Sequence, residues 1–160
     1  MAWTTPRTWS SEVLTSTNLN THLRDNLNAL YGTTTSYTPQ IDQGVTTNIA
    51  KTVNEARYLV LGRVCEVWFT LSLAAAGTAG SAVTVSLPQT ISGHATSPGA
   101  VLGSGFVYDA SVQFYTGPWR YNTSTTVTFT PQAGSFFGVS PNVALASTDV
   151  LSGWLRYVIA

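Results

Sequence analysis

Residues 64–73 constrain the fold more than any other part of the chain. Apolar side chains occupy every second position of this segment, namely Cys65, Val67, Phe69, Leu71 and Leu73, and a mixed set lies between them. Successive side chains of a strand point to opposite faces, so the pattern predicts a strand with one face on a core. Cys65 belongs to the apolar set and is predicted to be a small core residue.

Shorter runs with the same period continue to the end of the chain. They cover residues 56–62, 82–87, 100–108, 112–116, 119–122, 125–130 and 153–159, and 136–145 is a further candidate. Turn-forming residues separate them at 109–111, at Gly117-Pro118 and at Thr123-Ser124. Strands of this length and spacing predict a mainly β protein, with an antiparallel β-sandwich or jelly roll of about eight strands over residues 37–160.

A different period occupies the N-terminal region, residues 1–31, where we expect an arm and a short helix. Leucines recur at spacings of four, four and three, at Leu19, Leu23, Leu27 and Leu30, which predicts a helix with one apolar stripe. Any of residues 15–17 can cap its start, and Gly32 is suited to its end. So short a helix needs a partner surface. Either its own β domain or neighbouring subunits can supply it.

The arm before this helix carries two tryptophans, Trp3 and Trp9, around Pro6. An extended arm has no core of its own in which to bury such large side chains. They either fold back onto the chain or dock on a neighbouring protein as aromatic anchors. We therefore expect residues 1–31 to serve attachment or oligomerisation.

Charge is scarce in this chain. Only 9% of the residues are charged, the formal net charge is zero, and Lys51 is the sole lysine. Clustered cations, which nucleic-acid binding requires, are absent from the sequence, so we expect no nucleic-acid partner. A neutral surface favours association with other proteins. The N-terminus lacks the pattern of a secretory signal, and no apolar run is long enough to span a membrane, so we expect no membrane partner.

Patterns that support catalysis are also missing. The two histidines, His22 and His94, lie far apart, and Gly103-Ser104-Gly105 fails the nucleophile-elbow pattern because Leu102 precedes it. Carboxylates show no paired spacing, and His and Cys show no metal-ligand spacing. The sequence predicts no enzyme, no catalytic residues, no cofactor and no metal.

Aromatic side chains are the remaining functional feature. Six of them come from the late hairpins, and alternate members of this set are expected to fill the core: Phe114, Tyr115, Trp119, Tyr121, Phe136 and Phe137. Trp119 and Tyr121 follow the predicted Gly117-Pro118 turn and are the best candidates for a glycan contact at a loop tip.

The N-terminal residues resemble a known class of protein. Thr5-Pro6-Arg7-Thr8-Trp9, then Glu12 and Thr15, then the helix from Asn18 to Leu27 with its Leu-Arg-Asp-Asn motif, resemble the opening of small structural proteins of tailed-bacteriophage particles. About 30 of the 160 residues carry this resemblance. In pattern, the β-rich remainder is similar to the jelly-roll heads of phage decoration proteins and tail fibres.

The resemblance implies a non-enzymatic virion protein, assembled in the host cytoplasm. Proteins of this class are usually homotrimers, so the implied partners are further copies of the chain and phage capsid or tail proteins. By analogy, Arg24 and Asp25 serve inter-subunit or capsid contacts together with the tryptophans and leucines of residues 1–31. The first expectation is a capsid decoration or head-fibre protein. The alternative is a tail-associated fibre or receptor-binding module that recognises a host-surface glycan.

Overall fold

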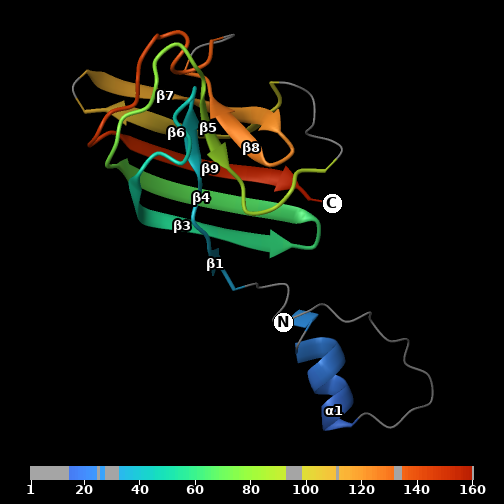
Figure 1. The fold of residues 1–160 in the computed structure, drawn as a ribbon. Helices are drawn as coiled ribbons and strands as arrows, with labels where there is room; N and C mark the ends of the chain where they lie inside the picture. Colours follow the sequence, from blue (N-terminus) through green and yellow to red (C-terminus); the bar gives the residue numbers. More distant parts are fainter. Residues whose placement is uncertain are drawn as a thin grey trace.

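The computed structural model describes residues 15–24, 26–27, 33–92, 99–110, 112–131 and 135–159, which form a short helical segment and a β domain (Figure 1). The helical segment comprises α1 (Ser16–Leu19) and the π-helical turn η1 (Asn20–Arg24). The strands are β1 (Thr35–Ser36), β2 (Ile41–Gln43), β3 (Lys51–Leu61), β4 (Val64–Leu73), β5 (Val83–Ser86), β6 (Val101–Asp109), β7 (Gln113–Thr123), β8 (Thr126–Phe129) and β9 (Val150–Val158).

The nine described strands form one curled antiparallel sheet in the order β1-β3-β4-β9-β6-β7-β8-β5-β2. Hairpins join β3 to β4, β6 to β7 and β7 to β8, while the last strand, β9, lies between β4 and β6. Curling brings β2 close to the start of β3, where the amide of Ile49 donates to the carbonyl of Ile41 over 2.8 Å. The expected fold class, mainly β with a short N-terminal helix, is confirmed, and the curled sheet is consistent with a sandwich-like fold.

The core lies inside the curl of the sheet. The five apolar residues of β4 are all buried, as their alternation predicts, and Cys65 is among them with no exposed surface. Burial raises the pKa of the Cys65 thiol. Three aromatic rings meet at the centre, where Trp119 lies 5.3 Å from Phe69 and 5.2 Å from Phe129 between ring centroids. These edge-on and tilted contacts are the geometries that aromatic pairs prefer.

Two glycines make room for the central indole. A Cβ atom added at Gly105 would lie 2.6 Å from Trp119 Nε1, and one added at Gly153 would lie 2.7 Å from the same atom. Gly105 and Gly153 face each other on the paired strands β6 and β9. The indole therefore packs directly on bare backbone at this point of the sheet.

The predicted turn at Gly117-Pro118 is wrong, because both residues lie inside the long strand β7. The Pro118 carbonyl accepts a hydrogen bond from Thr130, just beyond the end of β8. Backbone N–H and C=O of one residue point to the same side of an antiparallel strand, so Pro118, which lacks an N–H, faces Thr130 just past the last residue of β8 and removes no hydrogen bond from within that strand. The two strands predicted at 112–116 and 119–122 are consequently one.

The candidate strand at 136–145 is not formed either. Phe137 is buried and exchanges backbone hydrogen bonds with Phe129 and Val83, but the chain turns immediately after it. Gly138 has φ +97°, and a Cβ there would overlap the carbonyl oxygen of Ser81. The backbone at Gly138 leaves the extended conformation, and a strand cannot continue through it.

The turns packed against this region are held by a buried side chain, Gln43. Its Oε1 accepts from the Leu145 amide over 2.8 Å, and its Nε2 donates to the Val143 carbonyl over 2.8 Å and to the Ser81 carbonyl over 3.3 Å. A fully buried amide with all these partners fixes β2 against the 143–145 segment.

Candidate functional site

The helical segment begins where the sequence predicts. Thr15 is the N-cap, and its side-chain oxygen accepts a hydrogen bond from the Asn18 amide over 3.2 Å. After one α-helical turn the backbone widens into the π-helical turn η1, and helix resumes at residues 26–27. The Asn26 side chain donates to the His22 carbonyl over 3.2 Å, which supports this stretch from one side.

The leucine stripe, defined here as Leu19, Leu23 and Leu27, is exposed. These side chains retain 41%, 55% and 45% of their accessible surface. The helical segment projects away from the sheet beyond β1 (Figure 1). In the described part of the chain, the β domain therefore does not cover the stripe, and about half of the stripe's apolar surface is exposed.

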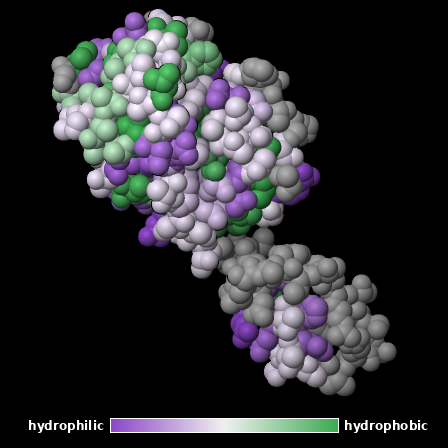
Figure 2. Space-filling view, in the orientation of Figure 1, coloured by the Kyte–Doolittle hydropathy of each residue, from purple (hydrophilic) through white to green (hydrophobic). Residues whose placement is uncertain are grey.

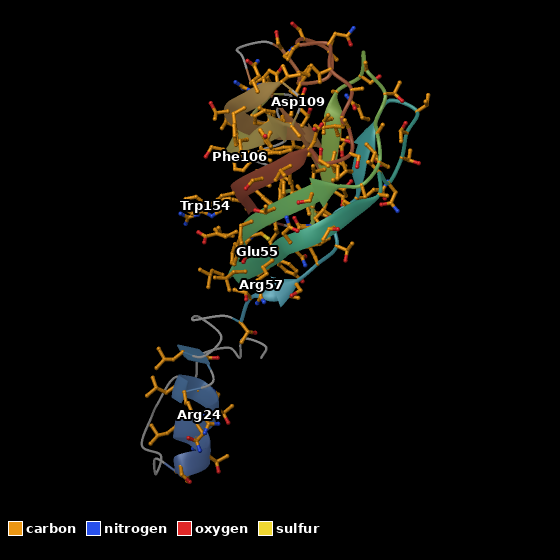
Figure 3. The ribbon with its side chains drawn as sticks, turned by 90° about the vertical axis from the view of Figure 1, so that its left-hand side faces the viewer. Arg24, Glu55, Arg57, Phe106, Asp109 and Trp154 are labelled. Carbon is orange, nitrogen blue, oxygen red and sulfur yellow. The ribbon has the colours of Figure 1, made fainter. Side chains whose placement is uncertain are left out.

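Several predicted attachment residues cannot be placed beside this stripe. Trp3, Trp9, Asp25 and Leu30 lie outside the described residues. Arg24 ends the π-helical turn and is exposed on the helical segment (Figure 3). The structure thus brings together Leu19, Leu23, Leu27 and Arg24 on one short projecting element.

The segment that joins this element to the β domain is anchored at the sheet edge. β1 pairs with β3 through Thr35 and Ser36, opposite Tyr58 and Arg57. The Arg57 guanidinium also donates to the Thr34 hydroxyl over 3.1 Å. The projecting element therefore leaves the domain from a fixed point on the edge of the sheet.

The predicted glycan contact at Trp119 is wrong. Trp119 has no exposed surface, and its Nε1 donates to the Ser152 carbonyl over 3.0 Å. Tyr121 is half-buried and packs against the same core. The continuity of β7 explains the burial of both side chains, because positions 119 and 121 lie on the inward face of this strand and not at a loop tip.

An exposed tryptophan lies elsewhere, at position 154 of β9. Its side chain retains 63% of its surface, and it pairs with Trp68 on β4 and with Ser104 on β6. Figure 3 shows Trp154 pointing away from the sheet, on the side that also carries Glu55, Arg57 and Phe106. The alternation of Leu155 and Tyr157 toward the core places Trp154 on the outer face, and this was the sequence signal that could have identified it.

A shallow groove of about 740 Å³ runs beside Trp154 across the outer faces of β9, β6 and β7. Trp154, Phe106 and Pro118 supply apolar surface, and Ser104 lies among them. Arg156 and Glu66 are the charged residues of the groove, and they form an ion pair with Arg156 Nε 3.6 Å from Glu66 Oε1. We call this feature the Trp154 groove.

A second aromatic group lies at the far end of β6 and β7. Phe114 is 62% exposed and stacks on Tyr108 with ring centroids 4.4 Å apart, while Phe106 lies 5.5 Å from it. In Figure 2, hydrophobic side chains on the visible face of the β domain are interspersed with hydrophilic ones. Among the aromatics of the late hairpins, Phe137 is buried and Tyr115 is partly buried, while Phe114 and Phe136 are exposed.

Buried acids in the described chain have structural partners. Asp149 accepts backbone hydrogen bonds from Ala110 over 3.0 Å and from Ala146 over 2.8 Å, joining two turns. Burial raises the pKa of Asp149, with a smaller contribution from nearby Asp109. Ser104, the serine between two glycines, lies within strand β6. Among the described residues, no group of three or more His, Cys, Asp or Glu is arranged to hold a metal ion.

No family model, curated protein or solved structure matches this chain. Within the part that the structure describes, no helix has the length and apolar character needed to cross a membrane. Three features of this chain bear on its function: the leucine stripe, the outer face of the sheet and the N-terminal sequence pattern.

Proposed function

We propose that this chain is a non-enzymatic structural protein of a tailed-phage particle, assembling with further copies of itself and with capsid proteins. The observation that carries the proposal is the leucine stripe, which projects from the β domain with 41–55% of each side chain exposed. The Asn18–Leu27 sequence that contains the stripe is also the part of the chain that resembles phage virion proteins.

Energetics favour a partner on this stripe. Full burial of a leucine contributes about 1.5–3 kcal/mol. Each leucine of the stripe has about half of its surface still exposed, so covering it contributes on the order of 1 kcal/mol per side chain. Three copies that meet along their stripes would gain this free energy for every leucine that they cover. In this arrangement the helices hold the trimer, the residues before them dock on the shell, and the β domains face outward.

The low charge of the chain agrees with such a role. Large interfaces with few charges spread their binding energy over apolar and hydrogen-bonded contacts, and little of it is lost at high salt. A cementing protein that resists genome pressure benefits from this kind of contact. The alternative place in the particle is the tail, where the same helical segment would attach a receptor-binding module.

Cryo-electron microscopy of intact particles tests the proposal. Density for the β domain at capsid three-fold or quasi-three-fold axes, in hundreds of copies, is the result we expect. Density confined to the tail, in a few copies, would replace decoration with the tail alternative. Particles that contain none of this chain would contradict a virion role altogether.

A further inference from the structure

The Trp154 groove combines the features of a ligand site. Its volume of about 740 Å³ lies within the range of small-molecule sites, which are mostly apolar with a few placed polar groups. Trp154 forms one exposed aromatic wall, and the Ser104 hydroxyl and the Glu66–Arg156 ion pair lie along the same groove. This face was not singled out by the sequence, which pointed to Trp119 instead.

Charge is concentrated around this site in a chain that has little of it. Arg57 and Glu55 lie on β3 beside Trp68, and Glu66 and Arg156 lie on β4 and β9 beside Trp154. The Trp68 Nε1 donates to Glu55 Oε1 over 3.1 Å, which fixes that indole beside the groove. This face of the sheet therefore combines exposed aromatic surface with side chains that can donate and accept hydrogen bonds.

We propose that the Trp154 groove binds a neutral oligosaccharide, with one pyranose ring stacked on the Trp154 indole. The C–H groups on one face of a pyranose are weakly positive and match the negative face of an aromatic ring. Glu66 accepts from sugar hydroxyls and Arg156 donates to them. Because these two charges are opposite and paired, the described groove has no net charge, and the ligand it fits is a neutral sugar.

A second copy of the chain fits the groove less well. The cores of protein interfaces are depleted of charged residues, and an interface over this face would desolvate the Glu66–Arg156 pair. The Arg156 side chain is 70% exposed and that of Glu66 is 26% exposed, so the arginine keeps its hydration in the free chain and can exchange water for sugar hydroxyls. The sugar therefore accounts for both the aromatic wall and the charged border.

The test compares the full chain with two matched variants, Trp154→Ala and Phe114→Ala. Both remove an aromatic side chain that is more than 60% exposed, but Phe114 does not itself line the groove and only contacts Phe106 at its end. Purified neutral bacterial surface polysaccharides, immobilised as an array, are the probes, and the best of them is then titrated by calorimetry. We expect Trp154→Ala to weaken binding at least about tenfold, Phe114→Ala to leave it within about twofold, and 500 mM salt to change it little.

Three outcomes would overturn the proposal. One is that the full chain binds none of the polysaccharides. Another is that Trp154→Ala binds as well as the full chain while remaining folded, as judged by its urea midpoint. The third is that Trp154→Ala lowers the molecular mass in solution and Phe114→Ala does not, which would make a second copy the occupant of this face. None of these outcomes depends on whether the leucine stripe drives assembly.

Discussion

Replacing each of two tryptophans with phenylalanine should affect the free energy of unfolding differently, because one lies in the core and the other on the surface. Trp119→Phe removes the indole N–H that donates to the Ser152 carbonyl, and the loss of this hydrogen bond costs about 0.5–1.5 kcal/mol. The smaller ring also leaves a cavity beside Phe69 and Phe129, which costs on the order of 1 kcal/mol. We expect Trp119→Phe to lower the free energy of unfolding by about 1.5–2.5 kcal/mol.

The matched control is Trp154→Phe. This side chain is 63% exposed, so the same change should alter the free energy of unfolding by no more than about 0.5 kcal/mol. Urea unfolding followed by far-UV circular dichroism measures both variants without depending on tryptophan fluorescence. Equal losses at the two positions, or a larger loss at Trp154, would refute the placement of Trp119 as the centre of the core.

Three further predictions concern buried polar groups. Gln43→Leu should lower the free energy of unfolding by more than about 2 kcal/mol, since it leaves the Leu145 amide and two carbonyls unsatisfied; an unchanged urea midpoint would contradict this. Cys65 should react with a thiol reagent only as fast as the protein unfolds, whereas rapid labelling of the native chain would show it accessible. Burial raises the pKa of Asp149, so its contribution to stability is largest in acid and is lost as pH rises from its ordinary pKa of 3.8 through the raised value. The free energy of unfolding of the natural chain minus that of Asp149→Asn should therefore decrease across that pH window. An increase of this difference with pH would contradict the raised pKa.

Local patterns account for what the sequence predicted correctly. The strict alternation in β4 requires only that one face of the strand be buried, and in the structure every second residue of β4 is buried. Thr15 caps the helical segment because its side chain competes for a backbone amide within three residues. Cys65 follows from its place in the alternation. Each of these features depends on neighbours in the chain and not on the rest of the fold.

Features that depend on distant pairing were missed. Gly117-Pro118 has the composition of a turn, but the end of the β8 ladder lets proline continue a strand there. That continuity moves Trp119 from an expected loop tip to the core. The groove next to Trp154 depends on β9 inserting between β4 and β6, which no local pattern specifies.

The most direct test of the account is the mass of the chain in solution, measured by light scattering at micromolar concentration. We expect a trimer, three times the 17.1 kDa of one chain. A variant with Leu19, Leu23 and Leu27 all changed to alanine keeps helix propensity and removes the stripe, so it should be a monomer. The control, with alanine at the exposed positions Thr17 and Asn20 of the same segment, should remain a trimer. A trimer that survives loss of all three leucines, or a natural chain that is monomeric under these conditions, would contradict assembly through the stripe.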